Sequence, residues 1–179
     1  MDEIHGRASL RVDATPEAVF DLITDVDRLP EWNTAIEKVL ERPPGLAEGV
    51  EWTVKMHPPR MPSWTSISRV EALDRHHLRF AYETRNGDGN PSRAKWAWEV
   101  TGAGGGAEVN VTWDVDLKTA DRRYFGGPMR RRMLAREVPN SLTAMANTVT
   151  ARGPKGTNWT DEGRGDPSRM GRDHAAPGA

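Results

Sequence analysis

Hydrophobic residues along this chain follow two different periods. Between residues 128 and 151 they recur every three or four positions, at Leu134, Val138, Leu142, Met145 and Val149. This spacing places them on one face of an α-helix. From about residue 35 to residue 117, apolar and polar positions alternate in short runs, which is typical of strands with one buried face. The two patterns predict a sheet of short strands followed by one long helix.

Pro139 lies in the middle of the predicted helix. A proline in a helix interior removes one backbone hydrogen bond and costs about 3 kcal/mol. It also moves the preceding residue, Val138, away from the helical conformation. Because the apolar stripe keeps its phase across the proline, we predict one helix with a kink near Val138. The alternatives are two helices, with Pro139 at the start of the second, or a loop.

Seven runs of residues are predicted to form strands. The run from Glu108 to Leu117 alternates strictly, so one of its faces is expected to be buried. The run from Ala35 to Glu41 mixes polar and apolar residues, which suits the edge of a sheet. The predicted strands are 4–12, 35–41, 49–57, 63–73, 78–83, 92–100 and 108–117.

Two short helices are predicted between the first two strands. Thr15 is a good N-cap, and Pro16 suits the first helical position that follows it. This first helix is expected to run to about Thr24. Residues 25–32 form a second short helix or turn, which we expect to end at Pro30.

The N-terminal motif resembles a known group of proteins. A strand is followed by Ala-Thr-Pro-Glu-x-Val-Phe and then by Asp-x-x-x-x-Pro-x-Trp, carried by Ala14, Pro16, Glu17, Val19, Phe20, Asp25, Leu29, Pro30 and Trp32. This order resembles the SRPBCC superfamily, the helix-grip group that includes START, Bet v 1 and polyketide cyclase/dehydrase-like proteins. The resemblance covers about residues 3 to 152.

The resemblance implies an α+β helix-grip fold. In this fold a curved antiparallel β-sheet wraps around a long C-terminal helix, with two short helices after the first strand. The family implies a hydrophobic ligand cavity between that helix and the sheet. It has no catalytic residue common to all members, so no catalytic role is carried over to this chain.

Composition limits the remaining possibilities. Residues 1–152 are predicted to form one domain, and residues 153–179, rich in Gly, Pro and charge, a disordered tail. The formal net charge is -1, which favours no nucleic-acid partner. With no apolar run long enough for a membrane span and no secretory signal, we expect a cytoplasmic protein, monomeric or homodimeric.

The candidate ligand site comes from the faces predicted to point inward. The chain has seven Trp residues, and pockets for small molecules are mostly apolar and aromatic. The expected ligand contacts are Trp52, Val54, Met56, Phe80, Tyr82, Trp96, Trp98 and Trp113 from the strands, Leu142 and Met145 from the helix, and Arg131 at the cavity mouth. Arg131 falls on the apolar stripe one turn before Leu134, so it either pairs with a ligand carboxylate or lies in a frayed end of the helix. The alternative is a filled core, and the resemblance favours the cavity.

Other reactive residues give weaker patterns. The histidines show no metal-ligand spacing and are expected at the surface, and Asp114 and Asp116 on a solvated strand face. No metal and no cofactor is predicted. An arginine cluster is a candidate contact for an acidic partner, a phosphate or RNA: Arg122, Arg123, Arg130, Arg131, Arg132 and Arg136.

Three functions are compatible with these patterns. The first is a carrier or binding protein for a small hydrophobic ligand, which is lipid-like, a polyketide or aromatic. The second is a polyketide cyclase/dehydratase-like enzyme, which needs an ionisable group inside the cavity. The third is an interaction module that acts through the arginine cluster. An inward His, Asp or Glu would favour chemistry, and a purely apolar cavity would favour a carrier.

Overall fold

The computed structural model describes residues 3–59, 61–120 and 126–151. The predicted tail, 153–179, lies outside these residues, as do Arg122 and Arg123. The elements in chain order are β1 (Glu3–Val12), α1 (Pro16–Thr24), η1 (Val26–Arg28), α2 (Leu29–Trp32), β2 (Ile36–Glu41), β3 (Glu51–Met56), β4 (Trp64–Asp74), β5 (Arg79–Asn86), β6 (Arg93–Ala103), β7 (Gly106–Asp116) and α3 (Gly127–Thr150).

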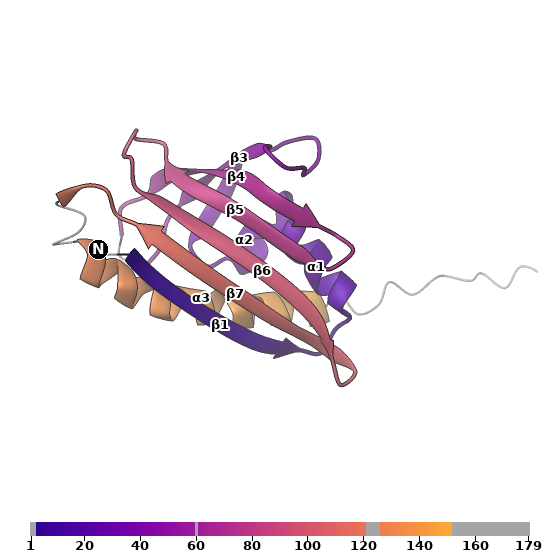
Figure 1. Ribbon diagram of the computed structural model, residues 1–179. Helices are drawn as coiled ribbons and strands as arrows, with labels where there is room; N and C mark the ends of the chain where they lie inside the picture. The colour runs from indigo at the N-terminus through magenta and orange to yellow at the C-terminus, as the bar shows by residue number, and fades with distance from the viewer. Residues whose placement is uncertain (1–2, 60, 121–125, 152–179) are drawn as a thin grey trace, which may run out of the picture.

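The strands form one antiparallel sheet in the order β1-β7-β6-β5-β4-β3-β2. The predicted edge strand, β2, lies at one end of this order, and bulges interrupt its pairing with β3. Figure 1 shows the sheet curving around α3, with α1 and α2 on the same side of the sheet as α3. The α+β helix-grip prediction is therefore confirmed.

The inner face of the sheet is built from alternate residues of adjacent strands. Tyr82 pairs with Trp96, and Trp96 pairs with Trp113, so three aromatic residues lie side by side across β5, β6 and β7. Val109, Val111 and Val115 of β7 are buried with them. The alternation seen in the sequence is therefore the alternation between the inner and outer faces of the sheet.

The short helices follow their local signals with one exception. The Thr15 side-chain oxygen accepts a hydrogen bond from the Ala18 N–H at 3.3 Å, and Pro16 opens α1. The expectation that Pro30 ends the second helix is wrong, because α2 runs from Leu29 through Pro30 to Trp32. A proline in the first turn costs little, since the first N–H groups of a helix have no intrahelical partner.

The long helix α3 is continuous through Pro139, so a loop or a break into two helices is ruled out. Pro139 is exposed, whereas Leu134, Val138, Leu142 and Met145 are buried against the sheet and the short helices. Polar contacts join α3 to the segment before β2. The Ser141 hydroxyl accepts a hydrogen bond from the Thr34 N–H at 3.2 Å. None of the helices described here is both long enough and apolar enough to cross a membrane.

Candidate ligand cavity between the sheet and helix α3

A cavity of about 460 Å³ lies between the inner face of the sheet and α3. Its walls come from strands β3 to β6, the end of β7, α2, and the first half of α3. Ligand pockets are typically ~300–1,000 Å³ and mostly apolar, so the size suits one small molecule. The helix and the sheet therefore do not pack solidly along their whole length.

Six of the residues predicted from the strands line this cavity. They are Trp52, Val54, Met56, Tyr82, Trp96 and Trp98. The register explains why they lie together, because Tyr82 faces Val70 on one side and Trp96 on the other. Trp52 contacts Tyr82 edge to face, with ring centroids 5.1 Å apart. These rings give the cavity a flat aromatic wall.

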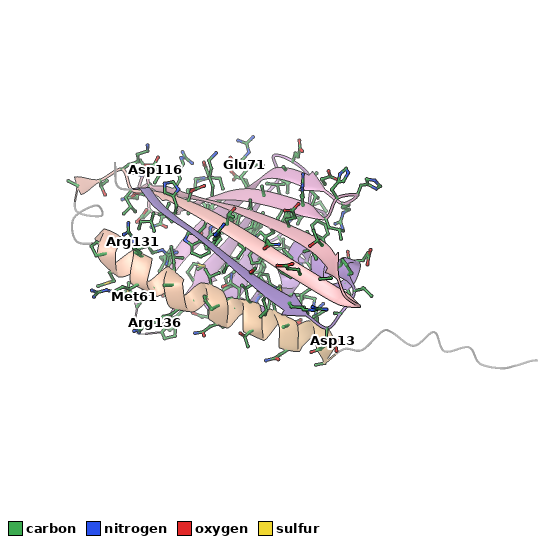
Figure 2. The ribbon with its side chains drawn as sticks, turned by 60° about the horizontal axis from the view of Figure 1, so that its bottom comes forward. Asp13, Met61, Glu71, Asp116, Arg131 and Arg136 are labelled. Carbon is green, nitrogen blue, oxygen red and sulfur yellow. The ribbon has the colours of Figure 1, made fainter. Side chains whose placement is uncertain are left out.

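The other predicted ligand residues lie outside the lining. Phe80 packs in the core behind Trp52, with ring centroids 6.2 Å apart, and Trp113 packs beside Trp96 at 5.9 Å. Leu142 and Met145 are buried further along α3, where the helix meets the sheet closely. Arg131 is exposed on α3, as Figure 2 shows, and does not line the cavity.

The helix side of the cavity carries residues that the hydrophobic pattern did not single out. Arg130, Met133, Glu137 and Ser141 line the cavity and are spaced by three, four and four residues. This is a second helical stripe, next to the apolar stripe, of which Leu134 and Val138 also line the cavity. Because each residue turns the helix by about 100°, Arg130 and Arg131 project in different directions. A search for a polar stripe flanking the apolar one would have found these residues.

Arg130 and Glu137 form an ion pair in the cavity wall. The Nη1 of Arg130 lies 3.5 Å from Oε2 of Glu137, and the two side chains are 26% and 16% exposed. Burial lowers the pKa of Arg130, and the nearby Glu137 opposes this effect. Burial raises the pKa of Glu137, and the charge of Arg130 opposes it. In the described cavity wall, Arg130 is therefore a loosely paired cation, and burial disfavours the charged form of the carboxyl group beside it.

The opposite wall supplies neutral polar groups. Ser66 and Ser68 of β4 are 7% and 3% exposed, and neither side chain makes a hydrogen bond with the residues described. Burial raises the pKa of Tyr82 to about 12, a shift that the nearby Trp98 side chain opposes. The Trp98 Nε1 nevertheless has no partner with hydrogen-bond geometry among the described residues. Tyr82 thus stays a neutral phenol at physiological pH.

Exposed residues surround the opening of the cavity. Pro62 and Ser63 come from the β3–β4 loop, Asp88 from the β5–β6 loop, and Met129 from the first turn of α3. Met129 is 55% exposed, and among the described residues Leu40, at 45%, is the other exposed large apolar side chain. The cavity opens to solvent between these two loops and the start of α3.

Residues 3–150 match the family described as "Polyketide cyclase / dehydrase and lipid transport". The chain belongs to this family. The match covers nearly all of the described residues and confirms the resemblance to the SRPBCC superfamily. No curated protein sequence matches this polyketide cyclase/dehydrase family member.

Solved structures share the fold of this family member. The Zhui aromatase/cyclase from Streptomyces sp. R1128 is 18% identical, with a TM-score of 0.70 over 86% of this chain and 97% of that one. Ara h 8.0201 is 14% identical, with a TM-score of 0.65 over 83% and 99%. TTHA0849 from Thermus thermophilus is 21% identical, with a TM-score of 0.62 over 84% and 99%. At these identities the likeness shows the fold alone.

Histidines and the paired aspartates lie outside the cavity of this family member. His5, His57, His76 and His77 are exposed, as predicted, and His174 lies outside the described residues. His5 pairs with Asp114 on the outer face of the sheet. Lys118 pairs with Asp116. Among the residues that the structure describes, none of these histidines and aspartates lines the cavity.

Proposed function

We propose that this protein binds a small hydrophobic ligand, lipid-like, polyketide or aromatic, and acts as a carrier or binding protein. The observation that supports this best is the cavity of about 460 Å³ beneath α3, walled by Trp52, Tyr82, Trp96 and Trp98. Moving apolar surface from water into such a cavity is favourable by about 25 cal/mol per Å². The aromatic wall suits a ligand that has a flat apolar part.

Filling the cavity should weaken ligand binding without harming the fold. Ala94 lines the cavity on β6, so an Ala94→Phe side chain occupies space that the ligand needs. Binding of a neutral apolar dye, N-phenyl-1-naphthylamine, should weaken by at least about tenfold. Fluorescence titration measures this loss, and thermal unfolding should show a melting temperature close to that of the wild type.

The matched control is Ala97→Phe on the same strand. Ala97 is exposed on the outer face, so the same side chain is added away from the cavity. This variant should bind the dye as the wild type does. Equal dye binding by Ala94→Phe and the wild type, with both folded, would show that the ligand lies elsewhere.

A second candidate function is a polyketide cyclase/dehydratase-like activity. It is favoured by Glu137, a carboxyl group that lines the cavity and whose pKa is raised by burial. In such a reaction, the Glu137 carboxylate would take a proton from a carbon between two carbonyl groups. The resulting carbanion attacks a third, more distant carbonyl of the same chain, the proton passes from Glu137 to the new alkoxide, and water is then lost. General acid–base groups with shifted pKa values suit this role.

Turnover separates the enzyme from the carrier. The protein is incubated with a linear poly-β-keto thioester, and aromatic ring formation is followed by absorbance. If Glu137 transfers the proton, Glu137→Gln should slow turnover by at least about 100-fold while the dye still binds. If the protein binds the thioester but aromatic rings form no faster than the uncatalysed rate, this activity is excluded and the carrier function remains.

A further inference from the structure

We infer that the ligand of this cavity carries a carboxylate and that Arg130 binds it. This inference rests on the proposed binding of a hydrophobic ligand in the cavity and specifies its chemical class. The ligand is then an amphipathic monocarboxylic acid. Its apolar part lies against the aromatic wall of the sheet, and its charged end lies against α3.

The first argument is the incomplete pairing of Arg130. A guanidinium group has five N–H donors and cannot lose its charge in a protein. Among the residues described, its ion-pair partner is Glu137, at 3.5 Å and through one nitrogen. Strong arginine–carboxylate pairs are shorter and use two parallel hydrogen bonds. Arg130 therefore has donors left for a ligand while it is largely removed from solvent.

The second argument is the position of Glu137. It lies seven residues after Arg130, about 10.5 Å further along the helix axis, so the Arg130 side chain reaches it only by extending along α3. Burial also disfavours the charged form of Glu137 and raises its pKa. Glu137 is thus a weak partner, and a ligand carboxylate of better geometry can replace it.

The third argument concerns the charges of the other residues that line the cavity. Arg93, the other arginine in the described lining, pairs with Glu83 at 2.8 Å. Ser66 and Ser68 are neutral, as is Tyr82 with its raised pKa. Arg130 is therefore the cation on the described cavity wall that is best placed to receive an anion. Apart from Arg93, the polar groups that the described strands add to the lining are neutral hydroxyls and amides, and Asp88 in the β5–β6 loop is acidic.

The test uses two probes of the same shape, 2-naphthylacetic acid and 2-naphthylacetamide, near neutral pH. Titration calorimetry should show that the wild type binds the acid at least about tenfold more tightly than the amide. Arg130→Gln should lose this preference, while its affinity for the amide stays within about twofold of the wild type. Unchanged amide binding also shows that the variant is folded.

Two further variants sharpen the test. Arg131→Gln removes the same charge from the neighbouring exposed residue, labelled in Figure 2, and should keep the preference for the acid. Glu137→Gln removes the competing carboxylate and should strengthen binding of the acid while leaving the amide unchanged. This opposite effect distinguishes a direct ligand contact from general damage to the cavity.

The outcomes also separate this inference from the proposed function. The role of Arg130 is overturned if the wild type binds the acid and the amide equally well. It is also overturned if Arg130→Gln and Arg131→Gln lose the preference for the acid to the same extent. Either result leaves ligand binding intact. If the folded wild type binds neither of the two probes nor the neutral dye, the proposed function and this inference are both overturned.

Discussion

A valine in place of Gly6 is expected to destabilise the protein by about 3 kcal/mol, the upper end of the usual range for overpacking a core. Gly6 lies on β1 opposite Trp113 of β7. A Cβ atom at this position would lie 2.1 Å from Cζ2 and 2.2 Å from Cε2 of the Trp113 indole. The ring cannot move away easily, because it is buried and packs beside Trp96. Urea unfolding of the two proteins measures the loss.

Gly45→Val is the matched control for this substitution. No atom lies within 4 Å of a Cβ at Gly45, so a change within about 0.5 kcal/mol is expected there. Replacing Trp113 by Ala in the Gly6→Val background should recover part of the loss, since the double variant removes the clash. If Gly6→Val were as stable as the wild type, the indole would not occupy the space above β1.

Leu142→Ala is expected to lose about 2–5 kcal/mol of stability, as is usual for a buried leucine. Leu142 is 2% exposed and does not line the cavity. The affinity for the neutral dye should therefore stay within about twofold of the wild type. Chemical denaturation and dye titration on the same preparation measure the two quantities.

Met129→Ala is the control on the same helix. Met129 is 55% exposed at the cavity opening, so its loss should change stability by no more than about 0.5 kcal/mol. A Leu142→Ala variant that kept its stability but lost dye binding would contradict the assignment of Leu142 to the core. It would instead support the ligand contact that the sequence predicts.

Most elements of the fold follow from local patterns. The run from Glu108 to Leu117 alternates in sequence and overlaps β7, whose apolar side chains point inward. The stripe through Leu134 and Val138 is the buried face of α3. Such patterns report burial because a strand repeats every two residues and a helix every 3.6. The wrong prediction that Pro30 ends the second short helix also has a local cause, since a proline that can end one helix is equally suited to open another.

The candidate site was only partly visible in the sequence. Alternation placed Trp52, Tyr82 and Trp98 on the inner face, and they line the cavity. The same alternation included Trp113, which packs over Gly6 in the core. The direction in which a side chain points is fixed by the place of its residue on one strand. Whether that side chain also lines a cavity depends on how far away the facing helix lies.

On the helix, the site predicted from the sequence contained Arg131 and not Arg130. Both lie one turn before Leu134, at three and four residues, and hydrophobic spacing does not separate them. The structure shows Arg130 on the cavity wall and Arg131 exposed. The direction of the cavity relative to α3 decides between the two, and that direction is set by the sheet.

The sequence by itself determined the order of the elements, the inward faces of β3, β5, β6 and β7, and the family of the chain. These depend on residues that are neighbours along one element, whose spacing the backbone geometry fixes. Only the tertiary structure decided that α3 stands away from part of the sheet, and that Arg130 and Glu137 face the space between them. Those features depend on contacts between residues up to about a hundred positions apart, such as Thr34 with Ser141. No periodicity within a single element records such distances.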